Sequence, residues 1–142
     1  MTRAFIDTNV IVYAHVDIHD QRSATARDLI FTLSGTDSAV ISIQVLNELF
    51  FTAVRKFKLS RTIARDMVRS LDGLVVIDLT RSITRMAQDI AVDHQFTIYD
   101  SLVIAAAKSA GCDRIYTEDL THNQVVQGIK IINPFLEQAT PS

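Results

Sequence analysis

Short apolar runs recur along the chain, and most are separated by enough residues to hold a helix. Each run is only three or four residues long, too short for a helix, and most are followed by turn or helix-capping residues. We therefore predict five strands, at Arg3–Ile6, Ala39–Ile41, Leu74–Ile77, Arg114–Tyr116 and Ile129–Ile132.

The intervals between these runs show helical periodicity. Apolar residues recur at helical spacing from Ile63 to Leu71 after Ser60, and from Ile83 to Ile90 after Thr80. Strands that alternate with helices, and that are apolar throughout, are typical of a mainly parallel sheet with helices on both faces. The pattern predicts an α/β fold.

Two further helices are predicted by unusually apolar segments. Leu102–Ala110 is apolar nearly all round and is followed by Gly111 at the place of a helix-ending residue, so we expect a buried helix that Asp100 opens. Gln44–Lys58 carries apolar residues on more than one face. Since one core contact does not need so much apolar surface, this helix is expected to bind a second partner and to form a homodimer.

Composition narrows the class of protein. The chain has 142 residues, 48% of them hydrophobic, which suits one domain over residues 1–138 followed by a short C-terminal tail, 139–142. A single cysteine, Cys112, cannot form an internal disulfide, and no apolar run reaches the roughly 20 residues of a membrane span. We expect a cytoplasmic protein with no membrane attachment.

Net charge argues against a general attraction for polyanions. At −2, it means that any nucleic-acid binding must come from a local basic patch or from a bound metal. Arg61, Arg65 and Arg69 recur every four residues on one predicted helix. They could line an RNA-binding surface, although a solvated basic face is the simpler account.

Four acidic residues occupy positions that suit a shared site. Asp7 follows the first predicted strand and Asp119 the fourth, and open parallel sheets build their sites at the carboxyl ends of strands. Glu48 lies in the helix after the second strand, and Asp100 precedes the buried helix. Each also has a structural interpretation, as a helix cap, a solvated helix residue or a turn residue, and spacing alone does not decide between them.

Carboxylates gathered in one cleft repel one another unless a hard divalent cation lies among them. Ligands that are all oxygen atoms favour Mg²⁺ or Mn²⁺ over zinc. Such an ion can lower the pKa of a bound water, hold a phosphate oxygen and offset charge on a leaving oxygen, which is the chemistry of phosphodiester hydrolysis.

Four motifs in order resemble the PIN-domain proteins. They are Phe5–Ile11 (FIDTNVI), Ile41–Ser42 with Asn47–Leu49, Tyr99–Ala107 (YDSLVIAAA) and Tyr116–Leu120 (YTEDL). The closing run Gly128–Phe135 (GIKIINPF) is similar to the end of VapC-type toxins. Together the motifs cover nearly the whole chain and are far more specific than any one of them alone.

The resemblance implies a fold, an activity and partners. The fold would be a three-layer α/β/α arrangement with a five-stranded parallel sheet in order 3-2-1-4-5. The protein would be a metal-dependent endoribonuclease that uses Mg²⁺, with Mn²⁺ as a substitute. It would be the toxin of a type II toxin–antitoxin pair, blocked by a small DNA-binding antitoxin.

The resemblance also assigns roles to residues. Asp7, Asp100 and Asp119 would be the main metal ligands, and Glu48 would hold a second metal or a water. Thr8, Asn9 and Ser42 would orient these carboxylates through hydrogen bonds, although Ser42 could instead cap its helix. Either Glu118 or Asp119 could reach the metal, and the Thr-x-Asp match favours Asp119.

Other acidic and histidine residues are weaker candidates. His15 and His19 have the spacing of a zinc pair but lack the glutamate of His-Glu-x-x-His. Asp78 ends a strand, but we interpret it as a local cap before Thr80.

Four other functions compete with a toxin nuclease. A receiver domain needs an acidic neighbour beside Asp7, and a haloacid-dehalogenase phosphatase needs an acid where Asn9 stands, so both patterns fail. An RNA-processing PIN nuclease outside a toxin pair stays open. A PIN fold used only to bind a partner usually lacks one of the four acids, and all four are present here.

Overall fold

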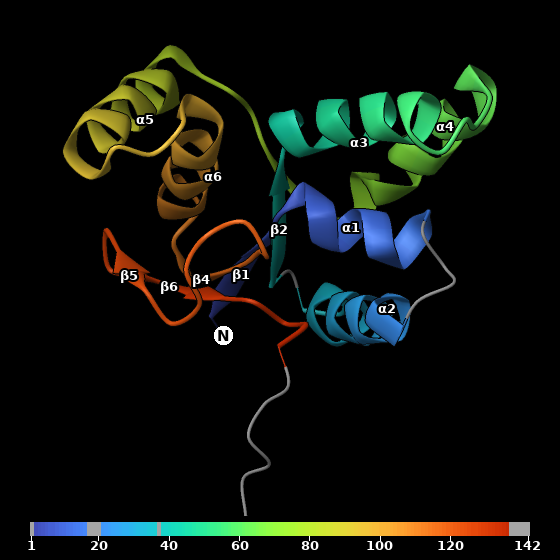
Figure 1. Cartoon of the computed structure of the whole chain (residues 1–142), viewed down its shortest axis with the longest axis horizontal. Coiled ribbons are helices and arrows are strands. Elements are labelled where there is room, and N and C mark those ends of the chain that lie inside the picture. The colour runs from blue at the N-terminus through green and yellow to red at the C-terminus, as the bar shows by residue number, and fades with distance from the viewer. Residues whose placement is uncertain (1, 17–20, 37, 137–142) are drawn as a thin grey trace, which may run out of the picture.

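A six-stranded sheet forms the centre of the computed structural model, which describes residues 2–16, 21–36 and 38–136 (Figure 1). The strand order is β3-β2-β1-β4-β6-β5, and every neighbouring pair is parallel except β5 and β6. The strands are β1 (Arg3–Ile6), β2 (Ala39–Ser42), β3 (Val75–Ile77), β4 (Cys112–Tyr116), β5 (Val125–Val126) and β6 (Ile129–Ile132). The expected parallel core and its order are confirmed, with β6 as the fifth parallel strand.

The sixth strand, β5, was not expected. It pairs antiparallel with β6 through a two-residue turn at Gln127 and Gly128, whose φ angles are 53° and 78°. Two positive φ angles in succession are the mark of the tight hairpin turn that matches the twist of a sheet. A strand of two residues is too short to produce a recognisable pattern in the sequence.

Helices cover both faces of the sheet. In Figure 1, α1 to α4 lie on one side, whereas α5 and α6 lie together on the other. The helices are α1 (Thr8–His15), α2 (Gln21–Ser34), α3 (Ile43–Arg55), α4 (Arg61–Arg69), the short 3-10 helix η1 (Ser70–Gly73), α5 (Arg81–His94) and α6 (Ile98–Ser109). Among the described residues, none of these helices has the length and apolar character to cross a membrane.

The start of one helix and the assignment of one cap differ from the sequence-based expectation. Helix α6 begins at Ile98 because the Thr97 hydroxyl caps it by accepting from the Asp100 amide, so Asp100 lies in the first turn and does not open the helix. The cap of α5 is Thr80, whose hydroxyl accepts from the Ile83 amide. The interpretation of Asp78 as the local cap was therefore wrong.

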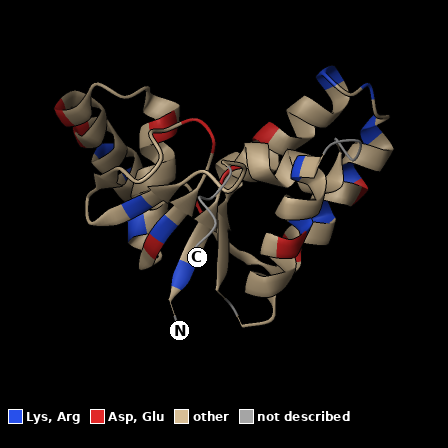
Figure 2. Ribbon diagram, turned by 60° about the horizontal axis from the view of Figure 1, so that its bottom comes forward, with Lys and Arg blue, Asp and Glu red and all other residues tan. Residues whose placement is uncertain are grey.

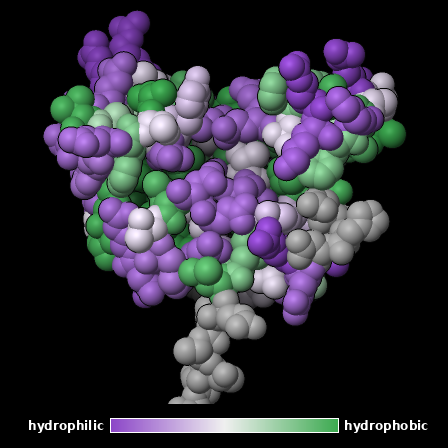
Figure 3. Space-filling view, in the orientation of Figure 1, coloured by the Kyte–Doolittle hydropathy of each residue, from purple (hydrophilic) through white to green (hydrophobic). Residues whose placement is uncertain are grey.

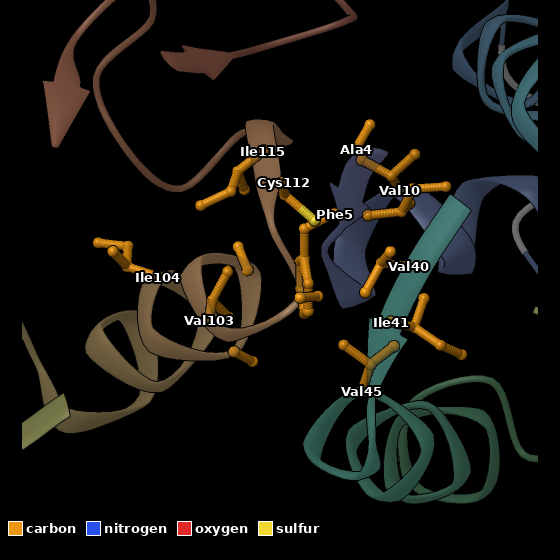
Figure 4. Close-up of a cluster of buried hydrophobic side chains, with 14 of the residues drawn as sticks. Ala4, Phe5, Val10, Val40, Ile41, Val45, Val103, Ile104, Cys112 and Ile115 are labelled. Atoms are coloured by element: carbon orange, nitrogen blue, oxygen red, sulfur yellow. The ribbon is translucent and has the colours of Figure 1, made fainter. Parts of the chain in front are cut away.

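The core is built where α6 crosses the middle of the sheet (Figure 4). Phe5 of β1 is fully buried, as are Val40 and Ile41 of β2. On the other side of β1, Ile104 and the small residues Ala105–Ala107 of α6 have no exposed surface, and small side chains let a helix approach a sheet closely. This packing fixes the carboxyl ends of β1 and β4 and the start of α6 relative to one another.

The expected division between a domain at 1–138 and a tail at 139–142 falls outside the described residues and stays a prediction.

Candidate active site

The carboxyl ends of β1 and β4 lie side by side, because these strands are neighbours in the sheet. Strand order reverses at this point, and such a reversal opens a crevice at the strand ends. Asp7 follows β1 directly, and its backbone amide donates to the Tyr116 carbonyl oxygen at 3.0 Å. In Figure 2, several acidic residues, drawn red, lie near the centre of the molecule, between the two groups of helices. Two of the expected site segments, at Asp7 and at Thr117–Asp119, therefore meet at this edge.

Asp7 is the most buried of the four acids. Its side chain is only 6% exposed, with one carboxylate oxygen accepting from the Thr8 amide at 2.8 Å and the other from the Thr117 hydroxyl at 2.8 Å. Burial, with smaller contributions from the charges of Asp119 and Glu48, raises the pKa of Asp7 to about 7, although the hydrogen bonds from Thr117 and Thr8 oppose the shift. With this pKa, Asp7 is only partly ionised at neutral pH, and a nearby positive charge would be needed to keep it fully ionised.

Glu48 faces the same crevice from α3. Its Oε1 accepts from the Thr8 hydroxyl at 2.8 Å and from the Gln44 side-chain amide at 3.4 Å. That same amide also donates to the Tyr99 carbonyl oxygen of α6 at 3.2 Å. Gln44 therefore ties Glu48 to the first turn of α6, where Asp100 lies.

Asp100 and Asp119 complete the set. Partial burial raises the pKa of Asp100, the charge of Asp119 adds to this shift, and the hydrogen bond to Thr97 opposes it. Asp119 is exposed on the loop after β4, and its backbone amide donates to the Thr117 hydroxyl at 3.1 Å. The charge of Asp119 raises the pKa of both Asp7, which follows β1, and Asp100, which lies on α6. Asp119 is therefore near both of these acids.

Asn9 and Thr117 set the shape of the loop after β4. The Asn9 side-chain amide donates to the Thr117 hydroxyl at 3.3 Å, and its carbonyl oxygen accepts from the Glu118 amide at 3.4 Å. The Glu118 carboxylate accepts from the Tyr13 hydroxyl at 3.1 Å. Glu118 thus turns toward α1, while Asp119 is the acid coupled to Asp7 and Asp100.

A hydrated divalent cation fits this set of groups. Among the described residues, no three acids, histidines or cysteines form a ready-made metal-binding group, yet the charges of Glu48 and Asp119 raise the pKa of Asp7, and the charge of Asp119 raises that of Asp100. All their donor atoms are oxygens, which Mg²⁺ and Mn²⁺ prefer. Gln44 adds a buried Oε1 that has no hydrogen-bond partner within the described part of the chain, and a water carried by a cation is a donor of the kind it lacks.

The sequence matches the family model described as "PIN domain" over residues 4–126. The chain belongs to the PIN-domain family. The matched range contains Asp7, Glu48, Asp100 and Asp119, and so includes every acid of the candidate site.

Solved structures share this PIN fold. VapC20 of Mycobacterium tuberculosis, described as a sarcin-ricin loop cleaving toxin, superposes with a TM-score of 0.67 at 21% identity, over 82% of this chain and 89% of that one. DNA-bound VapBC of Salmonella typhimurium gives a TM-score of 0.70 at 20% identity, over 92% and 97%. A toxin–antitoxin complex from Klebsiella pneumoniae gives 0.70 at 14% identity, over 93% and 98%. A search of curated proteins gives no match.

The structure gathers all four predicted acids at one edge of the PIN sheet, and two of the three predicted orienting residues contact this network. Thr8 holds Asp7 and Glu48, and Asn9 holds Thr117. Ser42 is buried and accepts from the Val45 amide at 3.4 Å, so it caps α3, the alternative that the sequence had left open.

Gln44 and Thr117 were missed as orienting residues. Thr117 stands inside the fourth motif, whose Thr-x-Asp pattern was used only to choose between two acids. Gln44 lies one helical turn before Glu48, and a polar residue on the buried side of a helix is the signal that could have identified it.

The other candidate residues lie away from this network or cannot be placed. Arg61, Arg65 and Arg69 are exposed on α4, and their contact with RNA stays a prediction. His15 is the last residue of α1, whereas His19 lies outside the described residues.

Proposed function

We propose that this PIN domain is a metal-dependent endoribonuclease that hydrolyses RNA phosphodiester bonds. The observation that carries the proposal is the buried Asp7, whose pKa is raised to about 7 in the company of Glu48 and Asp119. Placing an acid where its charge is destabilised reduces the stability of the metal-free fold, and strongly perturbed acids in a crevice are typical of functional sites. The PIN family match and the position at the reversal of strand order support the same conclusion.

The chain's own groups have distinct roles in this proposal. Asp7, Asp100 and Asp119 hold the cation, and Glu48 holds a second cation or a water. When bound, Mg²⁺ or Mn²⁺ activates water and stabilises negative charge on the phosphate. Thr8 and Thr117 keep both oxygens of Asp7 in fixed directions, and Gln44 keeps Glu48 beside α6.

We infer that the protein is the toxin of a toxin–antitoxin pair acting on cytoplasmic RNA. Support comes from the solved VapBC complexes and from VapC20, which share the fold over most of their length. A small DNA-binding antitoxin would block the acidic site by placing a basic side chain among its carboxylates, because such a charge replaces the electrostatic role of the cation. Growth arrest on expression of the chain alone, relieved by the antitoxin, is the expected result.

The exposed face of α3 supports a homodimer. Phe51 is 63% exposed on α3, and Ile63 is 57% exposed on the neighbouring α4. On the face of the molecule drawn in Figure 3, apolar areas lie among hydrophilic surface. Light scattering on the purified chain should give twice the monomer mass, and Phe51→Glu should give the monomer mass. A wild-type monomer at micromolar concentration would contradict this part of the proposal.

The nuclease proposal is tested by incubating structured and unstructured RNA with the protein in Mg²⁺ or Mn²⁺, then in excess chelator. Cleavage should require the ion and should leave a 5′-phosphate and a 3′-hydroxyl, because water attacks phosphorus without the RNA 2′-hydroxyl. A substrate with one deoxynucleotide at the cut site should still be cleaved there. Products that end in a 2′,3′-cyclic phosphate would show the mechanism to be wrong.

Growth separates a toxin from a processing nuclease. A chain that cleaves RNA in vitro but is harmless when overproduced belongs to RNA processing.

A further inference from the structure

A cleft leads away from the acidic site between α1 and α3. It has a volume of about 260 Å³, and Glu48 and Asp119 are among the residues that line it. The lining also includes residues of a different kind, namely Tyr13 of α1 and, in order along the chain after Glu48, Thr52, Lys56 and Phe57; the part formed by Lys56 and Phe57 is called the outer end. The cleft therefore joins a group of carboxylates to a lysine and two aromatic rings.

The outer end has the chemistry of a nucleotide-binding surface. The Lys56 ammonium lies 5.4 Å from the centre of the Phe57 ring, so a cation and an aromatic face are already paired there. Proteins bind single-stranded nucleic acid by pairing basic side chains with phosphates and aromatic rings with bases. Phe57 is half-buried and Lys56 is exposed, which leaves the ammonium accessible to a ligand.

The spacing of the cleft residues along α3 suits an RNA strand that runs along this helix from the acidic site. Glu48, Thr52 and Lys56 follow one another at intervals of four residues, so they lie along one face of the helix and its cap. Eight residues of helix span about 12 Å. Lys56 is therefore beyond the reach of the phosphate at the carboxylates but within reach of a nearby phosphate in the same strand.

The opposite wall is held rigid. The Tyr13 hydroxyl accepts from Arg22 at 2.9 Å and donates to Glu118 at 3.1 Å. The Tyr13 ring packs edge-on against Phe135, with 4.9 Å between the ring centres. Three contacts therefore fix this wall of the cleft, so Tyr13 presents a set surface to whatever binds opposite Lys56.

We propose that Lys56 and Phe57 form a subsite for a nucleotide adjacent to the cut site in a single-stranded RNA segment. Lys56 binds a phosphate next to the scissile one, and the Phe57 ring packs against an unpaired base. This subsite rests on the proposed nuclease function and deepens it. It also gives a protein of net charge −2 the local cation that binding of a polyanion requires.

The test measures binding separately from cleavage. A fluorescent single-stranded RNA dodecamer is titrated with the Asp7→Asn chain, which does not cut it, over a series of salt concentrations. Adding Lys56→Gln should reduce the slope of log affinity against log salt by about 0.7, the value for one lost phosphate contact on a single strand. Lys130→Gln, which removes an exposed lysine on β6, is the matched control and should leave the slope unchanged.

Kinetics on the active chain give the second measurement. Lys56→Gln should raise KM about 10-fold with little change in kcat, and Phe57→Leu should raise it by a similar factor through lost stacking. The subsite is wrong if the Lys56→Gln chain still cleaves RNA and keeps both the salt slope and the KM of its parent chain. That result would leave the nuclease proposal standing. The subsite is also wrong if the variant escapes antitoxin inhibition while binding RNA normally, because the cleft is then a protein-binding site.

The opposite result is equally distinct. If the wild-type chain cuts no RNA in any metal but Lys56→Gln still lowers the salt slope, the nuclease proposal fails, and Lys56 is an RNA-binding residue without a cut site beside it.

Discussion

Asp7 combines a structural and a chemical role in one side chain. It caps α1 and accepts from the Thr117 hydroxyl, yet its burial works against its own charge. The motif around Asp7 predicted its place in a shared acidic site, and the structure puts it near Glu48 and Asp119, whereas its role as a metal ligand stays a prediction. The hydrogen bond to Thr117 could not be predicted, because it joins residues 110 positions apart and depends on how β1 and β4 are paired.

Removing the charge of Asp7 should abolish most activity without unfolding the chain. Asp7→Asn should lower RNA cleavage roughly 100-fold or more, since the residue is proposed to bind the cation directly. Circular dichroism should stay near that of the wild type, because asparagine also caps helices. Asp78→Asn is the control: Asp78 is exposed, α5 is capped by Thr80, and activity should be retained. Full activity of Asp7→Asn would rule out the site assignment.

Thr117 should act on the cation through Asp7. Thr117→Val keeps the shape of the side chain but removes the hydroxyl that donates to Asp7 at 2.8 Å. We expect Mn²⁺ affinity, measured by calorimetry, to fall roughly 10–100-fold. Thr117→Ser keeps the hydroxyl and should restore most of the affinity. Equal affinity in the valine and wild-type chains would show that the bond does not orient Asp7.

At the scale of elements, the first turn of α6 assigns helix capping to Thr97, whereas the sequence analysis had given Asp100 both the start of the helix and a place in the metal site. The sequence correctly indicated a buried helix ending at Gly111, whose φ is +74°. It did not indicate that Thr97 supplies the cap, because the apolar pattern used to define the helix starts only at Leu102. Since Thr97 supplies the cap, the metal-binding role proposed for Asp100 does not conflict with capping of the helix.

Thermal melts should distinguish these roles. In chelator at neutral pH, Asp100→Asn should melt higher than the wild type, because the charge of Asp119 and partial burial both disfavour the ionised form of Asp100. Saturating Mn²⁺ should reverse the order, since an ion at about 100 times its dissociation constant adds about 2.7 kcal/mol to the wild type and less to a weakened site.

Thr97→Ala provides the comparison for a lost cap. It should melt lower than the wild type both with and without Mn²⁺, by about 1 kcal/mol in unfolding free energy. If Asp100→Asn behaved in the same way as Thr97→Ala, Asp100 would be structural rather than a metal ligand.

For the whole molecule, most of the architecture could be predicted and the finer contacts could not. Apolar runs such as Arg3–Ile6 mark strands well because they are buried on both faces. The hairpin strand Val125–Val126 escaped detection because it depends on backbone angles at Gln127 and Gly128. The contact between Gln44 and the Tyr99 carbonyl could not be predicted, because Tyr99 belongs to another helix, α6, that only folding brings beside α3.

The stability of the metal-free molecule should rise as pH falls. The pKa of Asp7 is about 7 in the folded chain, against 3.8 for an aspartate without burial or neighbouring charges. Ionisation of Asp7 therefore opposes folding, and this free-energy cost is at its full size above pH 7. The folded state binds the extra proton between pH 7 and about 4, and stability increases over that range. His15 works in the opposite direction, because burial lowers its pKa.

Comparison with Asp7→Asn isolates this effect. In denaturant melts with chelator, the unfolding free energy of the wild type minus that of Asp7→Asn should increase from pH 8 to pH 5, and the contribution of His15 cancels in the difference. A difference that stays constant over this range would mean that Asp7 is ionised throughout.

The pairing of β1 with β4 also has a consequence for synthesis of the protein. Asp7 leaves the ribosome early, but its partner Thr117 and the acid Asp119 are made 110 or more residues later. A nascent chain that has not yet released β4 carries Asp7, Glu48 and Asp100 but lacks Thr117 and Asp119, the residues after β4 that complete the group. If the proposed nuclease activity is correct, partly translated chains are harmless, and an antitoxin needs to meet only chains whose central strands have already joined.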